Sequence, residues 1–240
     1  MELHLNMDCG EELTGMFENV DQLLMPILSY CNIACGFHAG TKLTMHKTVQ
    51  HAIQTKVKIG AHPSFDDRAN FGRIYMNLTI ENLIDIIANQ VYELIKILDF
   101  ENAKLFHIKA HGALYNAAMT NEKEAIAIIE AVKLINPKLV IFAMDQSVLA
   151  RLAQSEGMNM MYESFADRNY LDATTLVPRT HPQALHESEN IIIEQILKLN
   201  EGEIKVLSGE TYNVKSNTIC LHSDHPKIFQ TFQKLKELVK

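Results

Sequence analysis

Short apolar runs alternate along the chain with longer stretches in which apolar residues recur every three or four positions. The short runs are typical of strands and the longer stretches of amphipathic helices. Strands are predicted at residues 3–8, 32–37, 57–62, 104–110, 138–144, 158–164 and 217–222. Helices are predicted at residues 21–30, 44–56, 79–98, 121–136, 146–156, 188–199 and 225–240. This alternation predicts an α/β fold with a parallel sheet.

The two faces of the predicted strands differ in polarity. Because successive side chains of a strand point to opposite faces, Leu5 and Met7 share one face and Asn6 and Asp8 share the other. Most other strands repeat this division, with ionisable groups near their carboxyl ends: Asp8, His38, His62, Lys109, His111, Glu163, His222 and Asp224. A sheet covered by helices on both sides would be apolar on both faces. The pattern therefore predicts an irregular (β/α) barrel of about seven parallel strands with a polar mouth, and the doubly wound open sheet is the alternative.

Length and composition limit the class of protein. The 240 residues suit one (β/α)-barrel catalytic domain, residues 1–240, and 47% of them are hydrophobic. The net charge of −7 predicts no basic face for nucleic acid or an anionic membrane. The first ten residues lack the pattern of a signal peptide, and no apolar run is long enough to cross a membrane. We therefore expect a cytoplasmic protein whose four cysteines are reduced thiols.

Seven short motifs resemble the successive motifs of the LamB/YcsF family, the A subunits of 5-oxoprolinase. They run in order from residue 5 to about residue 225: "NMDCGEE", "NIACGFHAG", "IGAHPSFDDRANFGR", "HIKAHGALYN", "ESFADRNY", "LVPR" and "TICLHSD". The resemblance implies a bacterial subunit of an ATP-dependent 5-oxoprolinase, which opens 5-oxo-L-proline (pyroglutamate) to L-glutamate with ATP hydrolysis. It also implies two partners, subunits B and C, and a barrel similar to the glycoside hydrolase/deacetylase type.

The chain departs from the family pattern at several positions. Thr41 stands where the family usually has Asp, Ala110 replaces a proline and Ser223 replaces a glycine. These changes leave open another small cyclic amide as the substrate.

Opening a lactam needs an activated water and a group that stabilises the developing negative charge. Asp8 and Glu163 are the candidates for the base, and Lys109 or a protonated histidine such as His111 is the candidate for the stabilising cation. We expect the remaining mouth residues to bind the substrate: Asn6, His38, His62, Arg168, Arg179, His222 and Asp224.

Two of these residues are arginines. A planar guanidinium binds a carboxylate through two parallel hydrogen bonds, so Arg168 or Arg179 can hold the carboxylate of an acidic substrate. For Arg168 the alternative is an internal ion pair with Asp167, Asp172 or Glu163.

ATP is implied by the resemblance alone. The sequence has neither GxxxxGK[ST] nor GxGxxG, so no common phosphate-binding loop is predicted. The coupling to ATP can therefore run through the partner subunits, with a phosphorylated lactam passed to this barrel.

Two other classes of function remain open. One is a metal-dependent, deacetylase-like amide hydrolase, for which Asp8, His38, His62 and His222 have suitable ligand types. The acid, base and cationic groups do not require a metal for lactam opening, so we expect activity to survive chelation. The other is a non-catalytic subunit that binds a small acid and presents it to a partner.

Overall fold

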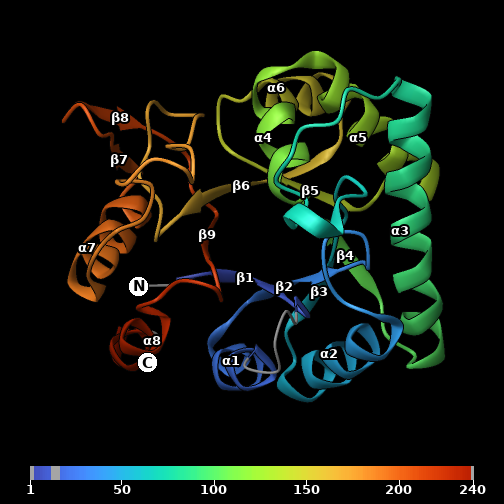
Figure 1. Cartoon of the computed structure of the whole chain (residues 1–240), viewed down its shortest axis with the longest axis horizontal. Coiled ribbons are helices and arrows are strands. Elements are labelled where there is room, and N and C mark those ends of the chain that lie inside the picture. The colour runs from blue at the N-terminus through green and yellow to red at the C-terminus, as the bar shows by residue number, and fades with distance from the viewer. Residues whose placement is uncertain (1–2, 12–16, 239–240) are drawn as a thin grey trace.

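Seven parallel strands close into a barrel in the computed structural model, which describes residues 3–11 and 17–238. Their order around the barrel is β1-β2-β3-β4-β5-β6-β9 (Figure 1). The strands are β1 Leu5–Cys9, β2 Tyr30–Ala34, β3 Lys58–His62, β4 Leu105–Ile108, β5 Val140–Ala143, β6 Asn159–Phe165 and β9 Thr218–Leu221. All seven predicted strands are present, and closure confirms the barrel over the open sheet.

Helices surround the strands, with α3 on one side of the barrel and α7 on the opposite side (Figure 1). They are α1 Phe17–Leu24, α2 Lys42–Thr55, α3 Ile80–Phe100, α4 Gly112–Thr120, α5 Glu122–Ile135, α6 Val148–Ser155, α7 Glu189–Asn200 and α8 Ile228–Leu238, with 3-10 turns η1 Met25–Ile27 and η2 Arg68–Asn70. Among these described helices, none is both long and apolar enough to cross a membrane.

The prediction was wrong in three places. The helix expected at 21–30 ends at Leu24. The 3-10 turn η1 follows, with Pro26 as its second residue, and Tyr30 already belongs to β2. Helix α4 was not predicted. The antiparallel pair β7 Glu203–Lys205 and β8 Thr211–Asn213, next to α7, was also not predicted.

Alternation along the strands produces the two faces that the sequence predicted. Met7, Ile33 and Ile108 are buried in the apolar core cluster. The barrel interior is polar instead: Asn6 Nδ2 donates to Thr218 Oγ1 at 3.0 Å, and Asn32 Nδ2 donates to Asn6 Oδ1 at 2.9 Å. Because these buried amides bond one another, the hydrogen bonds offset the cost of removing them from water.

His107 belongs to this interior and not to the mouth. Its Nε2 lies 2.6 Å from Asn32 Oδ1, and its ring stacks on Phe142 at a centroid distance of 4.0 Å. Gly60 on the neighbouring strand makes room for it, because a Cβ there would lie 2.1 Å from His107 Nε2. Burial, followed by the charge of Lys109, holds the pKa of His107 well below its usual value, so the ring is neutral.

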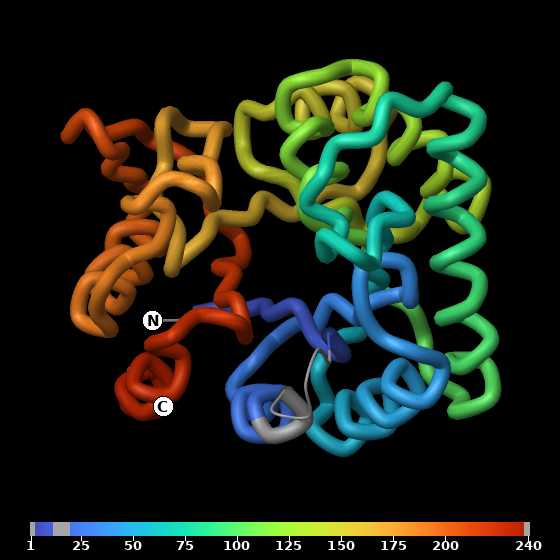
Figure 2. Tube along the Cα trace, in the orientation of Figure 1, coloured from blue at the N-terminus to red at the C-terminus, as the bar shows by residue number. Residues whose placement is uncertain are grey.

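The first and last strands of the barrel are direct neighbours. Asn6 pairs with Cys220 and Met7 with Leu221, so the blue start and the red end of the described chain lie side by side in Figures 1 and 2. Polar side chains from both ends therefore reach the same cavity. The four cysteines are buried and unpaired, as expected for reduced thiols: Cys9, Cys31, Cys35 and Cys220.

Candidate active site

A cavity of about 530 Å³ opens at the carboxyl ends of the barrel strands. Its ionisable lining residues are Asp8, Glu11, His62, Arg73, Lys109, His111, Tyr115, Arg168, Arg179, His222 and Asp224. Lys109 and His111 follow directly after β4, which ends at Ile108, so both lie at the mouth and His111 is the residue before helix α4.

Lys109 connects two carboxylates at the floor of this cavity. Its Nζ lies 2.8 Å from Asp8 Oδ1 and 2.8 Å from Glu163 Oε2, and its side chain is 2% exposed. Asp8 lines the cavity, whereas Glu163 is not among the lining residues. Asp8 Oδ1 also accepts a hydrogen bond from Asn32 Nδ2 at 2.8 Å, which fixes the carboxylate plane.

Charge pairing in this group outweighs the cost of burial. Burial alone would favour the neutral carboxyl, but His62 and Lys109 together hold the pKa of Asp8 well below its usual value. Burial likewise opposes the charge of Lys109, but Asp8, Cys220 and Glu163 raise its pKa well above the usual value. Asp8 is therefore ionised and Lys109 is a cation at neutral pH.

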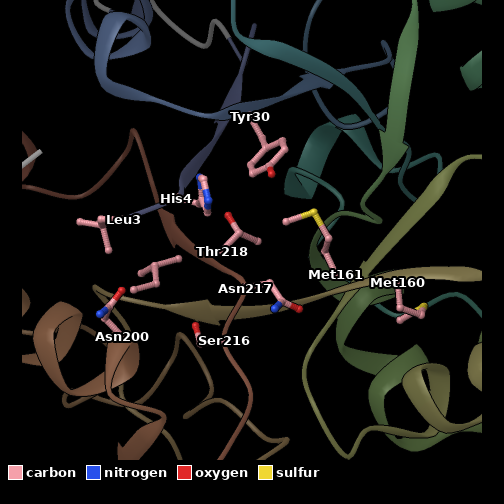
Figure 3. Close-up of a pocket in the computed structure, with 10 residues that line it drawn as sticks. Leu3, His4, Tyr30, Met160, Met161, Asn200, Ser216, Asn217 and Thr218 are labelled. Carbon is pink, nitrogen blue, oxygen red and sulfur yellow. The ribbon is translucent and has the colours of Figure 1, made fainter. Parts of the chain in front are cut away.

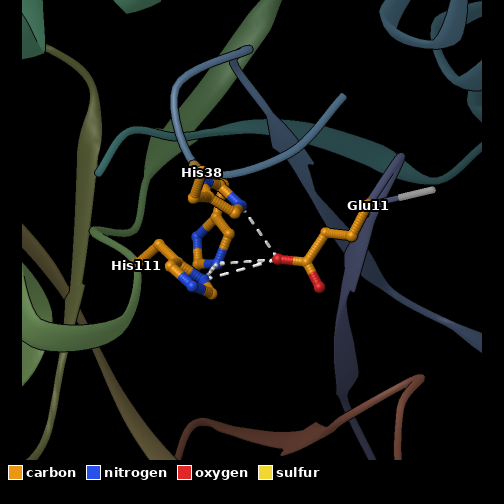
Figure 4. A group of neighbouring side chains, drawn as sticks. Glu11, His38 and His111 are labelled. Atoms are coloured by element: carbon orange, nitrogen blue, oxygen red, sulfur yellow. Dashed lines mark hydrogen bonds and ion pairs between the residues drawn. The ribbon is translucent and has the colours of Figure 1, made fainter. Parts of the chain in front are cut away.

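Three histidines and a glutamate form a second group beside Asp8. Glu11 Oε1 lies 3.0 Å from His38 Nε2 and 3.4 Å from His111 Nδ1, contacts drawn in Figure 4. His62 Nε2 lies 2.9 Å from His111 Nδ1 and 3.2 Å from Asp8 Oδ2. All are buried, yet Glu11, His62 and His111 still reach the cavity wall.

Burial shifts the protonation of this second group. Burial and the neighbouring charge of Asp8 raise the pKa of Glu11 to about 7. Burial lowers the pKa of His38 to about 3. Burial and the nearby His38 and His62 rings also hold the pKa of His111 well below its usual value. Both His38 and His111 are therefore neutral at pH 7.

His222 is oriented by a buried carboxylate. Its Nδ1 lies 2.8 Å from Asp167 Oδ1, and its backbone N–H donates to Asp167 Oδ2 at 2.9 Å. Burial would raise the pKa of Asp167, but His222 outweighs it and lowers that pKa strongly. Since Nδ1 is held by Asp167 and the residue lines the cavity, its Nε2 is the nitrogen available there.

Two arginines share one carboxylate at the rim. Asp224 Oδ2 lies 2.8 Å from Arg73 Nη2 and 3.1 Å from Arg179 Nη1. One negative charge therefore faces two positive ones, and the rim retains a net positive charge suited to an anion.

Arg168 anchors the loop that borders the mouth. Its Nη2 donates to the carbonyl of Val177 at 2.6 Å and its Nε to that of Ala184 at 3.3 Å. The ion pair considered from the sequence is not formed with Asp167, Asp172 or Glu163, all of which are described residues. Burial and then the charge of Arg179 lower the pKa of Arg168 to about 10, so it remains a cation.

Most of the predicted site residues come together at the mouth. Those that line the cavity are Asp8, His62, Lys109, His111, Arg168, Arg179, His222 and Asp224. Asn6 and Glu163 lie one layer deeper, in contact with Lys109. His38 stacks on His111 at a centroid distance of 3.8 Å and is not a lining residue.

The four expected metal ligands do not surround one point. His38 and His62 group with Glu11 and His111, whereas Asp8 and His222 group with Cys220. The expected ligand set of Asp8, His38, His62 and His222 therefore spans two groups of possible ligands, which approach each other where Asp8 Oδ2 lies 3.2 Å from His62 Nε2.

Sequence reasoning missed Glu11, Arg73, Tyr115 and Asp167. Glu11 and Asp167 stand inside the quoted motifs "NMDCGEE" and "ESFADRNY", which gave the only available signal. Arg73 closes the motif "IGAHPSFDDRANFGR". Tyr115 lies in the unpredicted helix α4, where burial and then Glu163 raise its pKa well above the usual value.

The departures from the family pattern remove no polar group from the cavity. Thr41 is the N-cap of α2, where its hydroxyl accepts from Thr44 N and Thr44 in turn bonds Thr41 N. Threonine thus performs the capping that an aspartate can also perform. Ala110 lines the cavity with a small apolar side chain, and Ser223 is buried next to His222 in the sequence.

A different hollow of about 450 Å³ lies at the amino ends of the strands (Figure 3). Its lining residues include His4, Tyr30, Met160, Met161 and Thr218. No carboxylate, lysine or arginine is among the described residues that line it. The carboxylates, the lysine and the arginines that line these two cavities are therefore gathered at the carboxyl end of the barrel.

The fold and the mouth define a (β/α)-barrel protein with a charged cavity at the carboxyl ends of its strands. The family model for LamB/YcsF matches residues 3–240, and the chain belongs to the LamB/YcsF family. It is 36% identical over 240 residues to the A subunit of 5-oxoprolinase from Bacillus subtilis (strain 168), covering 100% of this chain and 93% of that protein. It is also 36% identical to the A subunit of 5-oxoprolinase from Pyrococcus horikoshii over 241 residues, 100% of this chain and 94% of that one.

A solved structure agrees with this assignment. The crystal structure of the lactam utilization protein from Thermus thermophilus superposes with a TM-score of 0.88 at 31% identity, covering 99% of this chain and 97% of that chain. The barrel is therefore the fold of this family.

Proposed function

We propose that this chain is the lactam-opening subunit of an ATP-dependent 5-oxoprolinase, which converts 5-oxo-L-proline to L-glutamate together with partner subunits B and C in the cytoplasm. The observation that carries the proposal is the Lys109 ammonium at the floor of the cavity, 2.8 Å from each of two carboxylates. The names of the relatives, which refer to 5-oxoprolinase and to lactam utilization, support the substrate class.

Each group at the floor then has a distinct role. Lys109 stabilises the negative charge that develops on the carbonyl oxygen when water attacks. Asp8 is ionised and exposed to the cavity, so it orients and deprotonates that water. Glu163 lies behind Lys109 and balances its charge, which makes Glu163 a positioning residue.

Breaking the ring bond needs a proton for the departing nitrogen. His222 Nε2 is the donor for this step, because Asp167 holds the opposite ring nitrogen and leaves Nε2 directed at the cavity. A carboxylate bound to one ring nitrogen is a common way to fix the tautomer of a histidine.

The rim selects an acidic substrate. Arg73 and Arg179 share Asp224, and the charge that remains can bind the α-carboxylate of 5-oxoproline or the phosphoryl group of an activated lactam. Activation by ATP is assigned to the partners in this proposal, because the quoted motifs of the chain include no phosphate-binding loop.

The test is an assay of L-glutamate release from 5-oxoproline and ATP. The full chain is assayed alone and after mixing with subunits B and C from the same organism. We expect glutamate only from the complete mixture. Release of glutamate by the isolated chain, free of contaminating partners, contradicts the division of labour.

A matched pair of variants tests the site. Asp8→Asn should stop glutamate release without preventing assembly with the partners, which size-exclusion chromatography measures. Asp85→Asn, on the exposed side of α3, makes the same chemical change away from the cavity and should release glutamate at the wild-type rate. A fully active Asp8→Asn protein rules out Asp8 as the base. If the mixture binds 5-oxoproline without releasing glutamate, the chain is a binding subunit instead.

A further inference from the structure

His62 and His111 direct one ring nitrogen each at the other. His62 Nδ1 lies 2.7 Å from the carbonyl oxygen of Lys109, and His111 Nε2 lies 2.9 Å from that of Phe71. A carbonyl oxygen only accepts, so each ring donates an N–H to its backbone partner. The remaining nitrogens, His62 Nε2 and His111 Nδ1, are 2.9 Å apart, and Glu11 and His38 place further ligand atoms within 4.8 Å of them. Two imidazole nitrogens at this distance are held together by a shared proton or by a metal ion.

The surroundings of this contact match those of a metal centre. An imidazole that binds a metal usually donates its other N–H to a backbone carbonyl or a carboxylate, as both rings do here. Bonds of about 2.1 Å at right angles place two ligand atoms about 3.0 Å apart, and tetrahedral bonds place them about 3.4 Å apart. The nitrogen pair at 2.9 Å and the 3.4 Å between His111 Nδ1 and Glu11 Oε1 fall at these values, and the 3.9 Å between His62 Nε2 and Glu11 Oε1 corresponds to a wider angle at the ion.

We propose that Glu11, His62 and His111 bind one divalent transition-metal ion of the zinc class at the wall of the cavity. Imidazole nitrogen with a single carboxylate favours such an ion over magnesium or calcium, which prefer oxygen ligands. All three residues line the cavity, so an ion and a water ligand can enter from solvent. Asp8 Oδ2, 3.2 Å from His62 Nε2, adds a second negative charge beside the ion.

His38 supports the site without binding the ion. Its ring is parallel to that of His111, at 5° and 3.8 Å between centroids. A ring nitrogen binds an ion close to the plane of its own ring, and two stacked parallel rings have no such plane in common. His38 Nε2 instead hydrogen-bonds Glu11 Oε1 at 3.0 Å and orients the carboxyl group.

Two glycines allow the backbone to approach His111 closely. Gly72 has a φ of +65°, and a Cβ there would lie 2.9 Å from His38 Cβ and 3.0 Å from His111 Cδ2. Gly112 has a φ of +54°, and a Cβ there would lie 2.6 Å from the Gly72 carbonyl oxygen. The loop that carries the Phe71 carbonyl is thereby held against the ring it orients. When bound, the ion would supply Lewis acidity toward an oxygen atom in the cavity.

The experiment measures binding and does not depend on the proposed reaction. The full chain is freed of metal with a chelator and titrated with Zn²⁺ by calorimetry, and with Co²⁺ by visible absorption. We expect one ion per chain, with cobalt bands typical of nitrogen and oxygen ligands. In ¹⁵N-histidine NMR of the wild-type protein, one equivalent of Zn²⁺ should move two ring nitrogens to metal-bound positions.

Variants identify the ligands. Glu11→Gln and His111→Gln should each lower the affinity for Zn²⁺ by about 100-fold or more, and His38→Asn by about 10-fold. His46→Gln removes a partly exposed histidine of α2 and should leave the affinity unchanged. No stoichiometric binding, or binding that survives Glu11→Gln and His111→Gln in folded protein, overturns the proposal. An imidazolium signal for the His62–His111 pair that Zn²⁺ does not displace also overturns it, because the pair then shares a proton.

Discussion

Replacing Lys109 with methionine tests the site and the folding energetics together. The substitution keeps the length of the side chain and removes the charge that lies 2.8 Å from Asp8 and 2.8 Å from Glu163. Two buried carboxylates then face each other without a cation. We expect the variant to retain the barrel, to lose most glutamate release in the complete mixture and to be markedly less stable.

The size of the stability loss follows from the geometry. Coulomb's law at an effective dielectric constant of about 20 gives about 6 kcal/mol for each contact at this distance, before desolvation is subtracted. Breaking a buried pair by removing one partner typically costs about 3–5 kcal/mol, and we expect that range for Lys109→Met. In a chain of this length the loss corresponds to a melting temperature lower by about 10 °C.

The loss should depend on pH in a defined direction. In the wild type the pKa of Asp8 is lowered, so its contribution to stability is present at neutral pH and is lost only as pH falls through that low value. In the variant burial acts without the cation, and the folded protein binds a proton that the unfolded chain has released. The difference in unfolding free energy between wild type and variant should therefore shrink from pH 7 to pH 5, by about 1.4 kcal/mol per pH unit at most.

Urea unfolding at pH 7 and pH 5, combined with the glutamate assay, provides the measurement. Lys198→Met is the matched control, because that lysine pairs with Glu194 on the exposed surface of α7 and should change stability by less than about 0.5 kcal/mol. A Lys109→Met protein with wild-type stability and wild-type turnover would refute both the ion-pair energetics and the role of Lys109.

The remaining predictions concern the orienting carboxylate, the barrel interior and the rim. Asp167→Asn should lower kcat by about 100-fold and shift the pH profile, because His222 loses the partner that fixes its tautomer, and assays from pH 6 to 9 check this. Gly60→Ala should destabilise the fold by about 1–3 kcal/mol in thermal melting, since the new Cβ meets the His107 ring. Arg179→Gln should raise KM for 5-oxoproline by about 10-fold with little change in kcat, because it removes a charged contact that binds the substrate before reaction.

The barrel could be predicted because the alternation of apolar and polar residues along each strand shows which side chains share a face. In β1, Leu5 and Met7 indicate an apolar face, and Asn6 and Asp8 indicate a polar one. Among parallel sheets covered by helices, a closed barrel gives every strand that arrangement. Helix α4 could not be predicted, because its residues continue directly from β4 with no cap or periodic pattern to separate them.

The site was predicted in its location and only partly in its contacts. The alternation of side chains along the strands predicted Asp8, Lys109 and Glu163 on the interior face, and in the structure they form one ion-paired group. This alternation does not predict which loop residues fold back over the mouth, so Glu11 and Asp167 were missed. Their positions depend on tertiary contacts with histidines that are distant in the sequence.

The closure of the barrel between β1 and β9 also affects how the protein is made. The hydrogen bond between Asn6 and Thr218 joins residues 212 positions apart, and such long-range contacts make folding slow. During synthesis β1 leaves the ribosome long before β9. One edge of β1 therefore stays unpaired, and Asp8 cannot be buried, until the last strand is made. We therefore expect nascent chains that stop before residue 218 to aggregate or to require a chaperone, and the complete chain to acquire its charged site and its closed sheet in the same step.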